Sequence, residues 1–113
     1  MSHDVLARLA ATIRQRRSED AERSYTRQLI DGGPERCARK LGEEALETVI
    51  AGISQDERAL ANEAADLLYH LLVLLEARGV DWEEVIAVLE GRMGTSGLVE
   101  KASRAKQGEG GMS

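Results

Sequence analysis

Phenylalanine is absent from this 113-residue chain, which also contains one proline, one cysteine, one tryptophan and two tyrosines. So few aromatic residues and so little β-branched alternation leave little material for strands, whereas Ala, Leu, Glu and Arg favour helices. We therefore expect an all-α fold, a bundle of four to five helices per chain. The lone Cys37 cannot form an internal disulfide, and the start of the chain has no basic segment followed by an apolar one. Together these features predict a cytoplasmic protein.

Basic residues are outnumbered, 15 against 20 acidic ones, which gives a net charge of -5. This balance argues against a nucleic-acid partner held by a general positive field. The most apolar segment, LLYHLLVLLEA, is far shorter than the ~20 residues of a membrane span and contains Tyr69 and His70. We expect it to be a core helix, and we expect no membrane partner.

Apolar periodicity and capping residues predict four helices, over 4–17, 34–54, 56–78 and 81–92. In the last of these, Val85, Ile86 and Leu89 are expected to face inward. The polar segment 18–33 is expected to be mostly loop, with one turn of helix around 25–30. Residues 1–104 are predicted to form a single domain, and the glycine-rich residues 105–113 a flexible tail.

The stretch GEEALETVI places Glu43, Glu44 and Glu47 on one sector of a helix, at i,i+3 and i,i+4 spacing. Each like-charged pair at this spacing costs about 0.2–0.5 kcal/mol in an isolated helix. Lys40, one turn earlier, is the one cation on this sector, and a single lysine does not balance three acids. The pattern therefore raises the question of what else neutralises them.

A second acidic pair, Glu63 and Asp66 in NEAADLLYHLLVLL, precedes a stretch that is apolar on nearly every side. Asp66 is expected to lie close to burial, where an ionised carboxylate needs a cation or hydrogen bonds. If helices 34–54 and 56–78 form an antiparallel pair, the two acidic clusters face each other. An all-oxygen site of this kind suits Mg²⁺ or Mn²⁺ better than Zn²⁺, and it points to phosphoryl or pyrophosphoryl chemistry.

Plainer interpretations remain for each motif taken alone. Adjacent glutamates on a helix are usually a solvated face, and only the two acidic clusters together bring a metal site to even odds. His70 is more often a hydrogen-bonded core residue than a ligand, and Cys37 more often a small hydrophobic residue than a nucleophile. No catalytic role is assigned to either. The absence of Glu-x-x-His pairs disfavours a di-iron centre.

The pattern E-E-x-x-E followed by E-x-x-D resembles the signature of the all-α nucleoside triphosphate pyrophosphatases, the MazG-like superfamily. Four flanking stretches narrow the resemblance to the phosphoribosyl-ATP pyrophosphatase family, which acts second in histidine biosynthesis. These stretches are SYTRQL (24–29), KLGEEALETVIA (40–51), NEAADLLYHLLVLLEARG (62–79) and SGLVEKASR (96–104). The resemblance covers residues 4–104.

The resemblance implies an enzyme, a phosphoribosyl-ATP diphosphatase that uses Mg²⁺, in a homodimer whose helices form a four-helix core. By position, the acids that match the family's metal ligands are Glu44, Glu47, Glu63 and Asp66. Glu43 matches the first acid of the motif, with an outer-sphere or water-orienting role, and with the four ligands it completes the catalytic set. The candidate substrate-binding residues are Lys40, Ser24, Tyr25, Thr26, Lys101, Ser103 and Arg104, for which an intrahelical ion pair (Lys40) or an ordinary polar loop is the plain alternative.

Two rival functions stay open at this point. One is a housecleaning pyrophosphatase with the same acids and a different base pocket. The other is a non-catalytic helical dimer that binds a nucleotide.

Overall fold

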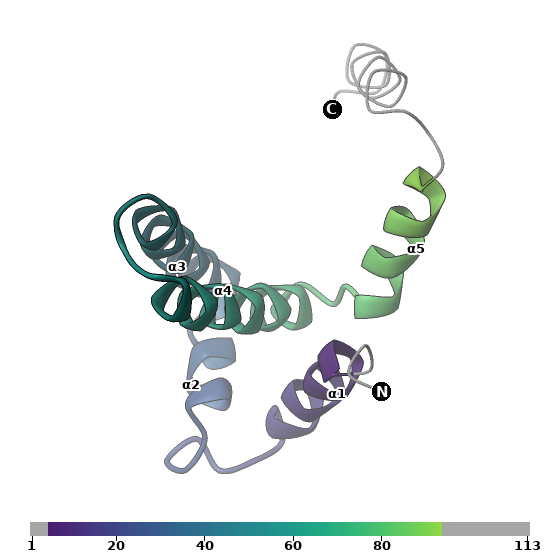
Figure 1. Ribbon diagram of the computed structural model, residues 1–113. Helices are drawn as coiled ribbons and strands as arrows, with labels where there is room; N and C mark the ends of the chain where they lie inside the picture. The colour runs from purple at the N-terminus through teal and green to yellow at the C-terminus, as the bar shows by residue number, and fades with distance from the viewer. Residues whose placement is uncertain (1–4, 94–113) are drawn as a thin grey trace. The chain divides into compact units, whose positions relative to one another are not determined.

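The computed structural model describes residues 5–93, and within that range the chain forms five α-helices and no strands. It divides into two compact units at the boundary between Trp82 and Glu83, and each unit is described by itself. The first unit contains α1, α2, α3 and α4 (Figure 1). The all-α prediction is confirmed over the described residues.

The first helix, α1 (Val5–Arg16), agrees with the predicted segment 4–17. It packs against α4 through apolar residues that include the fully buried Ile13. At its carboxyl end, Arg14 and Arg17 donate hydrogen bonds to the buried carboxylate of Glu76 on α4, at 3.4 and 2.7 Å. This ion-paired cluster attaches α1 to the far end of α4.

The segment predicted to be mostly loop contains a second helix, α2 (Tyr25–Asp31). The single turn expected around 25–30 is therefore a helix of two turns. Ser24 caps it by accepting a hydrogen bond from the backbone N–H of Arg27, and Leu29 anchors it in the core. Sequence periodicity underestimates a helix this short because the cap and one buried leucine carry most of its stabilisation.

The long helices α3 (Gly33–Ser54) and α4 (Glu57–Ala77) run side by side and antiparallel, joined by a two-residue turn (Figure 1). Their bounds agree with the prediction within two residues. Pro34 lies in the first turn of α3, and Asp56 caps α4 by accepting from the N–H of Ala59 at 2.8 Å. Gly79 has φ +73, a left-handed conformation that ends α4 and favours glycine.

The core of the first unit lies between α1, α2, the amino-terminal turns of α3 and the carboxyl-terminal half of α4. Its buried residues are Ile13, Leu29, Cys37, Leu72 and Val73. Much of the apolar face of α3 does not join this core within the single chain. Leu46, Val49, Ile50 and Ile53 remain 45–82% exposed. These four residues, which we call the apolar α3 face, form a group on one helix, whereas exposed apolar residues on a monomer are usually scattered singly.

The last described helix, α5 (Trp82–Arg92), begins directly after the predicted cap position. Beyond Trp82 it belongs to the second unit. Val85 and Ile86 are half-buried, as the inward prediction requires, but Leu89 is about half exposed. The prediction that Leu89 faces inward is therefore wrong. None of the described helices is long and apolar enough to cross a membrane.

Candidate metal and pyrophosphate site

Three of the predicted acids come together between α3 and α4. Glu44 on α3 and Glu63 and Asp66 on α4 each offer a carboxylate oxygen, and these oxygens lie within 4.8 Å of one another. The antiparallel pairing proposed from the short connecting turn is therefore confirmed. We call Glu44, Glu63 and Asp66 the carboxylate cluster.

A hydroxyl group joins the two helices at this level. Thr48 donates to the backbone carbonyl of Glu44 at 2.8 Å and, across the helix pair, to the carbonyl of Glu63 at 3.2 Å. The residues whose backbones it connects are the two half-buried members of the cluster. Thr48 thus sets the spacing of the helices where the acids meet, a role that its position in the motif did not reveal.

The electrostatics of the cluster are those of crowded like charges. Oε1 of Glu63 is buried and has no hydrogen-bond partner in the part of the chain that the structure describes. Burial raises the pKa of Glu63, and hydrogen bonding and charge from Glu47, then the charges of Asp66 and Glu44, raise it further. The fourth predicted ligand, Glu47, therefore lies next to the cluster.

Lys40, the cation one turn before Glu44 on α3, is paired with an acid outside the cluster. Nζ of Lys40 lies 3.2 Å from Oε1 of Glu43, one turn away on α3, and this hydrogen bond raises the pKa of Lys40. The intrahelical ion pair given as the plain alternative for Lys40 is thus present, with Glu43 at i,i+3 as its partner. A buried acceptor without a partner and an unbalanced set of carboxylates fit a divalent cation that prefers oxygen ligands.

Asp66 was expected to lie close to burial, and this is wrong: the residue is exposed. The apolar run that follows it packs on the core only from about Tyr69 onward, so the preceding turn of α4 stays at the surface. One side of the carboxylate cluster is therefore open to solvent, which allows a ligand to reach it without any movement of the helices.

The candidate substrate residues of the α2 segment differ in accessibility. Ser24 and Thr26 are buried, whereas Tyr25 is 50% exposed. Ser24 is the α2 cap, and the hydroxyl of Thr26 hydrogen-bonds that of Tyr69 on α4 at 2.5 Å. Of these three residues, only Tyr25 thus presents its side chain to solvent.

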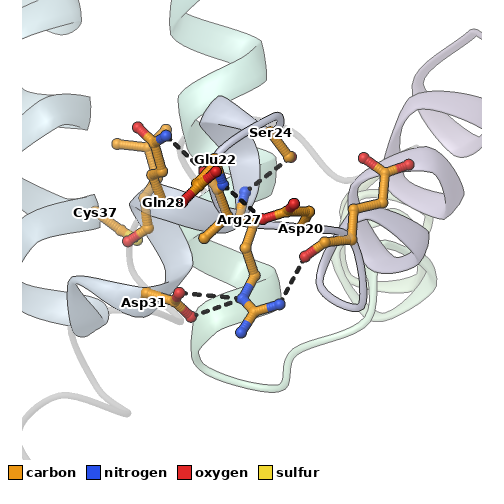
Figure 2. A network of polar contacts seen from close by, with 10 residues as sticks. Asp20, Glu22, Ser24, Arg27, Gln28, Asp31 and Cys37 are labelled. Atoms are coloured by element: carbon orange, nitrogen blue, oxygen red, sulfur yellow. Dashed lines mark hydrogen bonds and ion pairs between the residues drawn. The ribbon is translucent and has the colours of Figure 1, made fainter.

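Polar contacts fix the shape of the segment around Ser24 (Figure 2). Arg27 is the centre of this network. Its guanidinium donates to both carboxylate oxygens of Asp31 and to the backbone carbonyl of Glu19 at 2.7 Å, while Gln28 donates to the carbonyl of Ala21 at 2.6 Å (Figure 2). The loop that precedes α2 is thereby held against the helix.

His70 and Cys37 are both buried, as expected of core residues. Cys37 donates to the carbonyl of Leu29 at 3.2 Å. His70 was expected to be hydrogen-bonded, but its Nδ1 is buried without a partner among residues 5–93. The imidazole makes edge-to-face contacts with Tyr25 and Tyr69, at centroid distances of 6.3 and 5.0 Å. Burial and then the charge of Lys40 lower its pKa, against the opposite effects of Glu44, Asp66 and Glu43.

Basic residues close to the acidic motif were only partly identified from the sequence. A hollow beside Glu43, on the amino-terminal turns of α3, contains arginine residues that the motif analysis did not single out. The signal was present as basic residues at i, i+3 and i+4 before the acidic motif. Lys101, Ser103 and Arg104, predicted to contact substrate, lie outside the described residues.

The sequence of this chain is similar to those of known proteins. Residues 6–93 match the family of phosphoribosyl-ATP pyrophosphohydrolases, a span that contains all five acids of the motif. The chain belongs to this family. A phosphoribosyl-ATP pyrophosphatase of Cereibacter sphaeroides is 56% identical over 100 residues, which cover 88% of this chain and 97% of that protein.

Relatives from other bacteria lead to the same family. The protein named phosphoribosyl-ATP pyrophosphatase 1 of Bradyrhizobium diazoefficiens is 58% identical over 96 residues, covering 85% of this chain and 91% of its own length. That of Rhodopseudomonas palustris is 52% identical over 106 residues, 94% of this chain and 99% of that protein. The resemblance inferred from the sequence motifs is thereby confirmed.

Proposed function

We propose that the chain hydrolyses phosphoribosyl-ATP to phosphoribosyl-AMP and pyrophosphate, the second step of L-histidine biosynthesis. The observation that carries the proposal is the carboxylate cluster, formed by the motif acids in a member of the phosphoribosyl-ATP pyrophosphohydrolase family. In this reaction water adds to phosphorus and the anhydride bond between the α- and β-phosphates breaks. The names of the relatives support this substrate.

Glu44, Glu47, Glu63 and Asp66 would hold Mg²⁺, or Mn²⁺, in this proposal. When bound, the ion supplies positive charge for the phosphate oxygens and acidifies water. The fit is supported by the unpartnered Oε1 of Glu63 and by the raised pKa that burial and its acidic neighbours give that residue. Because the two helices fix the carboxylates from both sides, the ligands do not need to be ordered when the ion binds.

Glu43 and Lys40 would act beside the ion rather than on it. The carboxylate of Glu43 is 52% exposed and uses one oxygen to pair with Lys40, which leaves the other to accept a hydrogen bond from the attacking water. The ammonium group of Lys40 would meet a phosphate oxygen. Their ion pair keeps both groups at the edge of the carboxylate cluster before substrate binds.

The remaining substrate contacts are proposed from the two flanking segments. Tyr25 presents an exposed ring at the start of α2, and Ser24 and Thr26 would hold it in place through their buried hydrogen bonds. Lys101, Ser103 and Arg104 are proposed to close over the phosphates on the basis of the sequence resemblance alone. These residues would add positive charge that the acidic composition otherwise lacks.

We further propose that the enzyme is a cytoplasmic homodimer with a four-helix core, in which residues 1–104 act as one domain. The apolar α3 face supports the dimer because four large apolar side chains on one helix remain exposed in the single chain. A second copy of α3 and α4 would cover this face. Such burial would make the dimer part of the folded state rather than an addition to it.

The test is pyrophosphate release from phosphoribosyl-ATP, with Mg²⁺ and then with excess chelator, beside a panel of common nucleoside triphosphates. Release from phosphoribosyl-ATP alone, lost with chelator, is the expected result. Release from the panel instead would assign the protein to housecleaning. No release from any compound would leave a nucleotide-binding helical dimer.

A further inference from the structure

A basic hollow lies on the amino-terminal turns of α3, beside the carboxylate cluster. Its volume is about 520 Å³, and its lining residues are Gly32, Glu35, Arg36, Arg39, Lys40 and Glu43. Three of these side chains are cationic and two are acidic, and the pair between Lys40 and Glu43 neutralises one charge of each sign. Within the described chain, Arg36 and Arg39 make no ion pair and no side-chain hydrogen bond. Beside this pair the hollow contains Arg36, Arg39 and the carboxylate of Glu35, a net charge of +1 from two cations and one anion, and the guanidinium donors are available to a ligand.

Gly32 provides the space that Arg36 occupies. Its backbone is at φ -73, which any residue can adopt, so conformational freedom is not what glycine offers here. A Cβ atom built on Gly32 would lie 3.2 Å from Cβ and 3.3 Å from Cγ of Arg36, and closer still to Cδ. The stem of Arg36 therefore packs where a side chain at position 32 would be. The adjacent Gly33, in contrast, has φ +88 and is required by the backbone itself.

The hollow and the carboxylate cluster share one face of α3. Arg36, Lys40, Glu44 and Glu47 follow one another at i, i+4, i+8 and i+11, which is close to three full turns. Arg36 precedes Glu44 by eight residues, or about 12 Å along the helix axis. A long side chain can cover a good part of that distance. A ligand bound at the carboxylates can therefore extend into the hollow without leaving this face.

Phosphoribosyl-ATP has phosphate groups at two places, in the triphosphate chain and on the phosphoribosyl unit. The carboxylate cluster and its cation serve the anhydride bond that breaks, and at least one other phosphate must be neutralised elsewhere. We propose that Arg36 and Arg39 form a second phosphate subsite, which binds a phosphate group of the substrate away from the metal. The proposal rests on the proposed function for the identity of the substrate. Planar guanidinium groups bind phosphate through paired hydrogen bonds and suit this task better than lysine.

The experiment measures turnover and binding separately in three variants, Arg36→Gln, Arg39→Gln and Gly32→Ala. Arg8→Gln, which removes an exposed arginine of α1, is the matched control. In steady-state kinetics with phosphoribosyl-ATP, each arginine variant is expected to raise KM about tenfold or more, because it removes one charge-assisted hydrogen bond to the substrate. The value of kcat is expected to change less than about threefold. Gly32→Ala is expected to raise KM in the same way because it displaces Arg36. Thermal unfolding of the variants should match that of the control.

Binding is measured without turnover, by calorimetry in excess chelator with inorganic pyrophosphate and with ribose 5-phosphate. Binding of ribose 5-phosphate that weakens in the arginine variants would assign the subsite to the phosphoribosyl end, and the same result with pyrophosphate would assign it to the leaving group. Either result supports the subsite even if phosphoribosyl-ATP is not turned over, in which case the proposed function alone fails. Unchanged KM in both arginine variants, or unchanged binding of both probes, overturns the subsite.

Discussion

Replacing Glu47 by glutamine is expected to stabilise the metal-free protein and to abolish its activity. On α3, Glu47 lies at i+4 from Glu43 and at i+3 from Glu44, and across the helix pair it raises the pKa of Glu63. Two like-charged helix pairs at about 0.2–0.5 kcal/mol each give a gain of about 0.4–1 kcal/mol when the charge is removed. For a domain of this size the gain raises the melting temperature by roughly 2–5 °C.

With metal the sign of the effect reverses. A ligand that binds only the folded protein stabilises it by about 2.7 kcal/mol at a hundred times its dissociation constant. The variant loses a carboxylate ligand, so saturating Mg²⁺ should raise the melting temperature of the parent protein much more than that of Glu47→Gln. Turnover should fall about a hundredfold or more, because even groups that only support metal ligands contribute 10–100-fold.

The assay is thermal unfolding by circular dichroism, with chelator and with Mg²⁺ at equal protein concentration, together with pyrophosphate release. Glu57→Gln is the control, since Glu57 lies in the first turn of α4, where a negative charge favours the helix. This substitution should lower stability by a few tenths of a kcal/mol and leave turnover unchanged. A Glu47→Gln protein that is less stable than the parent in chelator, or that keeps full activity, would refute the reasoning.

Two further predictions concern His70 and the apolar α3 face. Burial lowers the pKa of His70, so as the pH falls below about 6.5 the unfolded chain takes up a proton before the folded chain does, and the free energy of unfolding decreases. His70→Gln should therefore make the free energy of unfolding in urea less dependent on pH between 7 and 5. An unchanged pH dependence would contradict this. Ile53 is 82% exposed in the single chain and is expected to be buried in the dimer. Burying such a side chain contributes about 1.5–3 kcal/mol, so Ile53→Glu should weaken self-association at least tenfold. Light scattering across a dilution series checks this, and a variant that stays dimeric at the dilution where the parent dissociates would place the interface elsewhere.

The long helices and the convergence of acids were predictable because each depends on patterns along the chain. Pro34, Asp56 and Gly79 mark helix ends by their own local chemistry, and the antiparallel pairing follows from the short turn before Asp56. Once the two helices pair, the distances from the turn bring Glu44 to about the level of Asp66 and Glu47 to about the level of Glu63. Periodicity predicted the two helices, the short turn predicted their pairing, and the spacing of the acids from that turn predicted that they would meet.

The incorrect predictions concern exposure and partners, which depend on neighbours distant in sequence. Asp66 precedes an apolar run and was expected near burial, but whether a turn of α4 is covered depends on where α1 and α2 pack. Lys40 has two acids within reach on its own helix, and the sequence does not determine that Glu43 is the one it binds. The partnerless Nδ1 of His70 likewise depends on the three-dimensional surroundings of the ring.

The hydroxyl of Thr48 has one hydrogen and two carbonyl acceptors, one on its own helix and one across the pair. If the helices move apart slightly, the hydroxyl still bonds to Glu44, 2.8 Å away, and no donor is left unsatisfied in the interior. Hydrogen bonding at Thr48 thus tolerates a small change in the distance between the helices at the level where the carboxylates gather. The same hydroxyl therefore keeps a hydrogen bond whether or not a cation offsets the repulsion between the acids, so its own satisfaction does not depend on the charge of the cluster.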